Sequence, residues 1–438
     1  MAEKKPNIRF KGFEEEWEDK SFADAYKSAA EGGTPSTSVK DYYVGGSIPF
    51  VKIEDTEQKY IHDTASHITE KGMNNSSAWL IPSNSIIFTN GATIGNVAIN
   101  KVPVTTKQGI LGVIQDTSKF DLEYLYYALS TDEFQTEVEK RQSKGTFATI
   151  ILRNLDKIDI PHTSLPEQRK IGEFFKQLDE LIGAKEQELE KLRQIKLALL
   201  DKMFPSDSQD NINGVGKSLI YNMLQNSSQL VVSSPAPNTP TIRFRGFTEP
   251  WEKYLISRRV TYGKGRGYSK ANLQQSGTPI LLYGTLYTDY NTNITEVDRY
   301  STKKEWAVIS KGNEVVVPAS GETAEDIARA SAILKAGIIL GGDLNIIYPD
   351  DKLDASFLAL ELTYGNSHRK LVKKAQGISV VHLHNTDISE LEINVPSYNE
   401  QRKIGDFFRS QDEAIANSQL QINKLKTIKQ ACLSQMFA

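Results

Sequence analysis

The sequence predicts an α+β protein made of two related modules in a pseudo-two-fold arrangement, joined by two long helices that pair as an antiparallel coiled coil. Three observations support this fold class. The phrase EQRKIGEFF at 167–175 returns as EQRKIGDFF at 400–408, an offset of 233 residues. The stretch IRFKGFEEEWE at 8–18 returns as IRFRGFTEPWE at 242–252, an offset of 234 residues. Helical apolar spacing follows both copies of the first phrase, so the whole chain reads as a duplication.

Composition is that of a globular protein with room for two or more domains. The chain has 438 residues, of which 39% are hydrophobic and 24% are charged. Its single cysteine, Cys432, excludes an internal disulfide and a cysteine-based zinc site. No apolar run is long enough for a membrane span, and MAEKKPNIRF lacks the apolar centre of a secretory signal. We therefore expect a cytoplasmic protein with no membrane association.

The interiors of the two halves, residues 22–150 and 255–385, mix short strands, turns and helices. SIIFTNGATIGNVAI at 85–99 predicts two strands joined by a turn, and 121–140 and 355–374 have helical patterns. The two interiors show little similarity to each other, although their flanks repeat. Two different interiors in one frame indicate related modules with different targets.

Each EQRKIG phrase is predicted to open a long helix with an apolar seam. A proline precedes each phrase closely, at a position where helices tolerate it, and Pro205 ends the first helix. Residues 167–204 would form a rod of about 57 Å. One apolar stripe per rod predicts that the two helices pair with each other. The seam residues are Leu178, Ile182, Leu189, Leu192, Ile195, Leu199 and Met203 in the first helix, and Ile415, Ile422, Leu425, Ile428, Cys432 and Met436 in the second.

Basic clusters are the candidate nucleic-acid contacts. They lie at matching places, near the end of the predicted module helices, and in the glycine-rich stretch GKGRG at 263–267. Lys and Arg neutralise phosphates, and Arg and Gln pair with base edges in the major groove. A solvated helix end whose cations suit the helix dipole is the alternative. The candidates are Lys140, Arg141, Lys144, Thr146, Lys264, Arg266, Arg369, Lys370, Lys373, Lys374 and Gln376.

Charge alone gives the DNA interpretation uneven support. The formal net charge is -3. Residues 22–150 carry 11 Lys and Arg against 15 Asp and Glu, a net of −4, whereas residues 255–385 carry 16 against 13, a net of +3. The first module must therefore concentrate its cations locally or rely on partners for phosphate contacts.

Motifs of enzymes and cofactor sites are missing. An adenine methyltransferase needs an Asn/Asp-Pro-Pro-aromatic signature, which the chain lacks. Gly216-Lys217-Ser218 has Asn211 where a phosphate loop needs its first glycine, and the six histidines form no H-E-x-x-H pattern. We therefore expect no catalytic residue, cofactor or metal site in this chain.

Taken together, the repeated PEQRKIGEFF at 166–175, the LLDKMF ending at 199–204, their copies at 400–408 and 433–437, and the openings IRFKGFEEEW and GGTPST resemble the DNA-specificity subunit of Type I restriction-modification systems. The resemblance covers nearly the whole chain. It implies target-recognition domains at 1–160 and 241–390, helical regions at 161–204 and 391–438, and a linker at 205–240. It also implies a non-catalytic subunit that binds double-stranded DNA and holds two methyltransferase subunits, which use S-adenosylmethionine, with restriction subunits in the full complex.

By the same resemblance, the helix surfaces outside the seam would dock the two methyltransferase subunits, each recognition domain would read half of a split target, and the rods would set the spacing. The residues expected at the docking surfaces are Gln168, Arg169, Lys170, Phe174, Gln401, Arg402, Lys403 and Phe407.

Two other functions remain open from sequence. The first is a coiled-coil scaffold or interaction protein with no DNA role, although such a protein has no need for two different interiors with matching basic helix ends. The second is a self-sufficient methyltransferase or nuclease, which the missing motifs disfavour.

Overall fold

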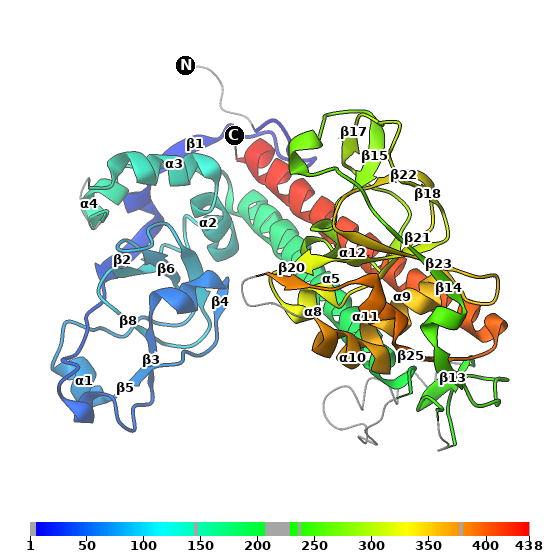
Figure 1. The fold of residues 1–438 in the computed structure, drawn as a ribbon. Coiled ribbons are helices and arrows are strands. Elements are labelled where there is room, and N and C mark those ends of the chain that lie inside the picture. The colour runs from blue at the N-terminus through cyan, green and yellow to red at the C-terminus, as the bar shows by residue number, and fades with distance from the viewer. Residues whose placement is uncertain (1–5, 144–147, 206–227, 235–237, 376–379, 438) are drawn as a thin grey trace. The chain divides into compact units, whose positions relative to one another are not determined.

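The computed structural model describes residues 6–143, 148–205, 228–234, 238–375 and 380–437 (Figure 1). The chain divides into two compact units, residues 1–186 with 420–438, and residues 187–419. The first and second units each contain one module and a part of each long helix. The predicted linker lies mostly outside the described residues, as do Gly216-Lys217-Ser218.

Two long helices dominate the helical content. Helix α5 runs over Leu165–Lys202 and helix α12 over Tyr398–Met436, which confirms both predicted rods. The other helices of the first unit are α1 (Glu70–Asn74), α2 (Leu122–Leu129), α3 (Asp132–Arg141) and α4 (Leu152–Leu155). Those of the second unit are α7 (Thr285–Thr288), α8 (Ala324–Ile327), α9 (Ala355–Tyr364), α10 (Asn366–Lys374) and α11 (Asn385–Ser389).

The first module is built on a five-stranded sheet of order β2-β9-β6-β7-β4 and a three-stranded sheet of order β5-β3-β8. Strands β6 and β7 pair antiparallel, which confirms the strand pair predicted at 85–99, and β4 pairs parallel to β7. The strands are β1 (Glu18–Ser21), β2 (Tyr26–Glu31), β3 (Ile48–Val51), β4 (Tyr60–Ile61), β5 (His67–Ile68), β6 (Ile86–Thr89), β7 (Val97–Asn100), β8 (Thr105–Thr106), β9 (Ile110–Gln115) and β10 (Asp159–His162).

The second module repeats this topology despite its different sequence. Its five-stranded sheet has the order β14-β23-β19-β21-β16, again with a parallel last pair, and a four-stranded sheet has the order β17-β15-β22-β18. The strands are β11 (Leu230–Val232), β12 (Ile242–Phe244), β13 (Glu252–Leu255), β14 (Val260–Lys264), β15 (Thr278–Leu281), β16 (Asn293–Ile294), β17 (Tyr300–Ser301), β18 (Ile309–Lys311), β19 (Glu314–Pro318), β20 (Ser320–Gly321), β21 (Ser331–Ile333), β22 (Ala336–Leu340), β23 (Leu344–Pro349), β24 (Val381–His382) and β25 (Glu392–Val395).

The helical stretches at 121–140 and 355–374 are each broken into two helices. Thr131 ends the run in the first module and caps α3, because its side chain accepts the backbone N–H of Phe134 at 3.3 Å. Gly365 separates α9 from α10 in extended backbone. Asp121 and Asp354 cap α2 and α9 through equivalent hydrogen bonds.

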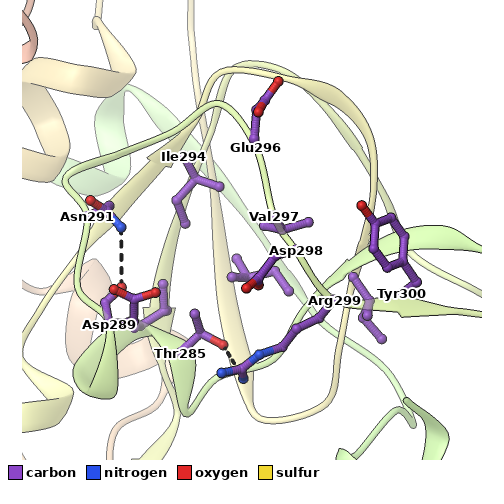
Figure 2. A pocket seen from close by; sticks show the side chains of 12 residues that line it. Thr285, Asp289, Asn291, Ile294, Glu296, Val297, Asp298, Arg299 and Tyr300 are labelled. Atoms are coloured by element: carbon purple, nitrogen blue, oxygen red, sulfur yellow. Dashed lines mark hydrogen bonds between the residues drawn. The ribbon is translucent and has the colours of Figure 1, made fainter. Parts of the chain in front are cut away.

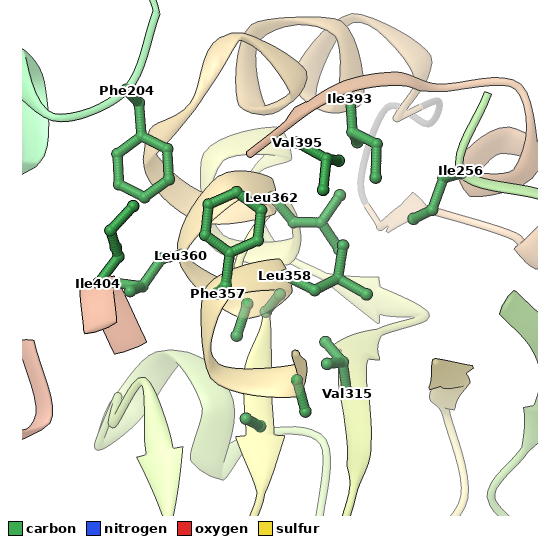
Figure 3. Packing of buried hydrophobic residues seen from close by; sticks show 14 of the residues in the cluster. Phe204, Ile256, Val315, Phe357, Leu358, Leu360, Leu362, Ile393, Val395 and Ile404 are labelled. Atoms are coloured by element: carbon green, nitrogen blue, oxygen red, sulfur yellow. The ribbon is translucent and has the colours of Figure 1, made fainter. Parts of the chain in front are cut away.

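Helix α9 lies at the centre of the second unit's core (Figure 3). All but one of its residues are buried, and Leu358 and Leu362 pack among Val395 and other strand residues. The end of α5 closes this core, because Phe204 stacks on Phe357 with ring centroids 5.9 Å apart.

The end of α12 closes the first unit's core in the same way. Phe437, 233 residues after Phe204, lies 5.1 Å from the Tyr124 ring and 6.1 Å from the Phe175 ring. Leu433 and Met436 are buried beside it. The seam prediction missed the buried Leu200, Phe204, Leu433 and Phe437, and it was wrong for Ile428, which is 50% exposed.

Cross-helix contacts confirm antiparallel pairing inside each unit, because rising positions of α5 meet falling positions of α12: 179 meets 429 and 186 meets 426 in the first unit, and 193 meets 419 and 196 meets 412 in the second. In the first unit, Lys429 of α12 lies 2.6 Å from Asp179 of α5. In the second, Lys196 of α5 pairs with Asp412 of α12. The two ion pairs are equivalent, because Lys196 corresponds to Lys429 and Asp179 to Asp412 at the 233-residue offset. The lysine comes from α12 in the first unit and from α5 in the second.

Candidate nucleic-acid interface and helix surfaces

The repeated phrases meet inside each module as a buried ion pair. The Arg9 guanidinium donates to both carboxylate oxygens of Glu167, at 2.7 and 2.8 Å, and Arg243 donates to Glu400 at the same two distances. Both glutamates are completely buried. Trp17 adds a third donor to Glu167 at 3.2 Å. The start of each module is thereby fixed to the start of its long helix.

The glutamine that follows each glutamate holds the N-terminal cap of a module helix, α2 in the first module and α9 in the second. The side-chain oxygen of Gln168 accepts the N–H of Asp121 at 2.8 Å, and that of Gln401 accepts the N–H of Asp354 at 2.9 Å. Their amide nitrogens donate to backbone carbonyls, including those of Thr163 and Pro396. Gln168 and Gln401 were expected on a docking surface, but the structure buries both and gives them this internal role.

The lysine of each phrase lies over the repeated aromatic segment. The Lys170 ammonium is 5.0 Å from the Phe10 ring, and the Lys403 ammonium is 4.9 Å from the Phe244 ring. Phe174 and Phe407 pack edge-on against the same two rings, at 5.8 and 5.6 Å. Both phenylalanines are half-buried.

Arg169 and Arg402 differ from the rest of the phrase. Both side chains are exposed, at equivalent positions one residue after the buried glutamine. Of the eight residues expected at docking surfaces, these two are exposed and form no hydrogen bond or ion pair with another described residue. The other three pairs stabilise the modules.

The basic cluster of the first module lies at the end of α3. Lys140 and Arg141 both pair with Glu137, and Lys140 holds it at 2.7 Å. The two cations lower the pKa of the Glu137 carboxyl to about 2, Lys140 being the larger cause. Lys144 and Thr146 lie outside the described residues.

The basic cluster of the second module lies along α10. Lys370 is 3.4 Å from Glu392, and Lys374 is 2.5 Å from Glu390. Arg369 and Lys373 are exposed and form no ion pair with another described residue. Gln376 falls in a segment that the structure leaves undescribed.

The glycine-rich stretch at 263–267 consists of the last two residues of β14 and the tight loop that follows them. A Cβ at Gly265 would lie 1.7 Å from the carbonyl oxygen of Gly341, and Gly267 has φ +54°, so both positions favour glycine. Lys264 and Arg266 alternate with these glycines and are exposed. The loop packs beside Tyr268, Lys304 and Trp306, which the sequence analysis did not single out.

A cavity of about 310 Å³ opens in the second module near β16 and β17 (Figure 2). Apolar side chains and the carboxylates of Asp289, Glu296 and Asp298 line it. Arg299 is the one basic lining residue, and its guanidinium donates to the Thr285 hydroxyl at 2.9 Å. Three carboxylates against one cation make this cavity a poor site for phosphate.

The part of the chain that the structure describes contains neither a candidate metal site nor a candidate membrane span. No group of three or more His, Cys, Asp or Glu there lies close enough to hold a metal ion. No described helix combines the length and the apolar character needed to cross a bilayer.

Comparison with known proteins identifies relatives of both halves. A family model described as the Type I restriction modification DNA specificity domain matches residues 14–194 and, a second time, residues 248–427. The Type I restriction enzyme MjaIX specificity subunit of Methanocaldococcus jannaschii is 34% identical over 192 residues, which are 43% of this chain and 44% of that protein. The EcoR124I/EcoR124II specificity subunit of Escherichia coli is 29% identical over 35% of this chain and 39% of that protein.

The matched segments thus span less than half the length of these curated relatives. A solved structure covers the whole chain: the S subunit of a Type I restriction-modification system from M. genitalium aligns with a TM-score of 0.59 at 14% identity, over 99% of both chains. It shows the fold. The relatives are named as specificity subunits, which agrees with the expectation that this chain is not the methyltransferase or the nuclease. With two copies of the family domain covering most of its length, the chain belongs to the Type I restriction-modification DNA-specificity family.

Proposed function

We propose that this chain gives a Type I restriction-modification complex its DNA specificity, with each module reading one half of a bipartite target. One observation carries this proposal: the two modules share one sheet topology, although the sequences of residues 22–150 and 255–385 differ. Two modules with the same fold and different sequences suit a split target whose two halves differ. The exposed cations Lys264, Arg266, Arg369 and Lys373 support DNA contact by the second module.

The paired helices would separate the two modules and dock two methyltransferase subunits. Helix α5 has 38 residues and α12 has 39, which corresponds to about 57–59 Å each. One turn of DNA is about 34–36 Å, so rods of this length suit two half-sites separated by a short gap. Methylation at adenine N6 would be done by the partner with its own S-adenosylmethionine, and restriction subunits would join this core.

Arg169 and Arg402 are the residues we assign to methyltransferase docking. They are exposed, equivalent and surrounded by positions that the chain uses internally. We predict that Arg169→Glu and Arg402→Glu each reduce the bound methyltransferase from two copies to one, and that the double variant binds none. Native mass spectrometry of the reconstituted complex measures this, and each single variant is the control for the other. Two bound copies in the double variant would place docking elsewhere.

A methylation map tests the function itself. The chain is expressed with its neighbouring methyltransferase in a methylation-free host, and the genome is sequenced by a method that detects N6-methyladenine. We expect a new motif of two short half-sites around a fixed gap, present only when this chain is present. A stable complex that leaves no new methylation would instead favour a scaffold without DNA recognition.

A further inference from the structure

An exposed tryptophan in the second module lies where two loops that carry exposed cations meet. Trp306 is 43% exposed, whereas Trp17 and Trp251 are 6% and 2% exposed and Trp79 is half-buried. Lys304 lies beside its ring. Arg266 precedes Gly267, which lies against the indole, Lys303 precedes Lys304, and all three cations are exposed. We call Arg266, Lys303, Lys304 and Trp306 the Trp306 surface. An exposed indole in a soluble protein is informative when charged groups of one sign gather around it.

Buried Tyr268 fixes the geometry of this surface. Its hydroxyl accepts the N–H of Lys304 at 2.9 Å and donates to the carbonyl of Thr302 at 3.1 Å, which ties the loop after β17 to the glycine loop. The rings of Tyr268 and Trp306 are 5.1 Å apart. A Cβ at Gly267 would lie 2.7 Å from the indole, so the glycine lets the backbone lie against the ring. The surface is therefore built by tertiary contacts.

Its cations are available to an outside anion. The Lys304 ammonium lies 5.0 Å from the Trp306 ring and 5.6 Å from the Tyr268 ring, and among the described residues neither it, Lys303 nor Arg266 pairs with a carboxylate. Glu305 is the one acidic residue within 302–307. By contrast, Lys370 and Lys374 of α10 are already paired with Glu392 and Glu390. An already neutralised cation gains less from a phosphate than an unpaired one.

The matching place in the first module is chemically different. Trp79 precedes β6 as Trp306 precedes β19, in the sequences NNSSAW and STKKEW. Trp79 is half-buried and packs close to Gly112 of β9. No lysine stands in NNSSAW. The tryptophan that precedes β6 thus packs against β9, whereas the one that precedes β19 is exposed on a segment with two lysines.

We propose that the Trp306 surface is a DNA-contact surface of the second module, in which Arg266, Lys303 and Lys304 bind phosphates and the Trp306 ring lies against the nucleotides between them. The inference rests on the proposed function and names the residues that perform it. Cations beside an exposed aromatic face fit a polyanion that also carries planar groups, because phosphate attraction and ring contact add. The acidic wall of the cavity near β16 and β17 does not fit this partner.

The test compares two double variants in the full chain bound to its methyltransferase. Fluorescence anisotropy measures binding to a duplex carrying the mapped target over a series of salt concentrations. We expect Lys303→Ala/Lys304→Ala to weaken binding about tenfold or more and to reduce the salt slope by about 2, because two phosphate contacts are lost. Lys370→Ala/Lys374→Ala is the matched control, with the same charge change and a smaller effect.

Tryptophan emission supplies an independent readout. Because the other three tryptophans are buried or half-buried, iodide quenches mainly Trp306, and the duplex should protect it. Trp306→Phe should abolish this protected component while it keeps the fold. Wild-type affinity and slope in the Lys303/Lys304 variant, or unchanged iodide quenching on DNA binding, would overturn the inference and leave the proposed function intact. A wild-type complex that binds no duplex would overturn both.

Discussion

Glu167 and Glu400 are the residues that explain why the chain carries one phrase twice. Each carboxylate is fully buried and held by both arms of one arginine from the start of its own module. Both partners recur in the sequence at nearly the same offset, so the pair was visible as a repeated Arg and a repeated Glu. Sequence alone did not show that the two repeats touch, and it therefore assigned the phrase to outside partners.

Removing one arginine of such a pair is expected to be costly. Arg243→Ala leaves the Glu400 carboxylate buried without its guanidinium, which costs about 3–5 kcal/mol. Chemical denaturation of the full chain measures the loss of unfolding free energy. Hydrogen exchange shows whether the loss lies in the second unit. Arg402→Ala is the matched control, because it removes an exposed arginine two residues from Glu400. Equal stability of the two variants would show that the pair contributes little.

Glu361 gives the second module a pH-dependent stability. Burial raises the pKa of its carboxyl to about 8, and one oxygen accepts the Ser367 hydroxyl at 2.8 Å. Below the ordinary glutamate pKa of about 4.3 the group is protonated in both states. As the pH rises from there to about 8, the unfolded chain releases the proton first, so the folded state loses stability over that window.

Glu361→Gln removes this ionisation while it keeps the shape of the side chain. We expect its melting temperature to exceed that of the wild type by several degrees at pH 8.5, since each pKa unit corresponds to about 1.4 kcal/mol. The difference should shrink toward pH 5. Thermal melts at a series of pH values measure it, and a difference independent of pH would refute the ionisation argument.

At the scale of elements, the long helices were the most predictable part of the fold. Their apolar spacing persists over many turns, and the observed bounds differ from the prediction by two residues at either end of α5. The breaks at Thr131 and Gly365 were missed, because apolar spacing continues across them. The Trp306 surface was beyond prediction, because Tyr268 and Trp306 are brought together by contacts distant in sequence.

Charge reversal tests the helix pairing. Lys196→Glu places two carboxylates together where Lys196 meets Asp412, and we expect a loss of about 1–2 kcal/mol. Adding Asp412→Lys restores opposite charges and should recover most of the loss. Urea denaturation of the single and double variants forms a double-mutant cycle. Additive effects, with no recovery, would mean that the two side chains do not interact in solution.

At the scale of the whole molecule, both long helices are shared between the two units, so each unit contains one part of α5 and one part of α12. The first unit contains residues 1–186 and 420–438, so its core is complete only when the last residues of the chain are in place. The shared topology of the two modules was hidden from sequence, because buried strands accept many combinations of apolar residues. The duplication was visible only where specific polar and aromatic contacts restrict the residue at each position.

The final prediction concerns the two phenylalanines that complete the cores, Phe437 in the first unit and Phe204 in the second. Phe437→Ala removes a ring that packs on Tyr124 and Phe175, and should destabilise the first unit by about 3 kcal/mol. Amides of α2 should then exchange faster, while those of α9 keep their protection. Phe204→Ala should reverse this pattern, because its ring packs on Phe357 of α9.

Hydrogen exchange read by mass spectrometry on the two variants measures both patterns. Leu420→Ala is the control, since that side chain on α12 is 51% exposed. Equal acceleration of α2 and α9 in both variants would show that the chain unfolds as one cooperative body. Opposite patterns would show that the core of each module depends on the end of the long helix that follows the other module.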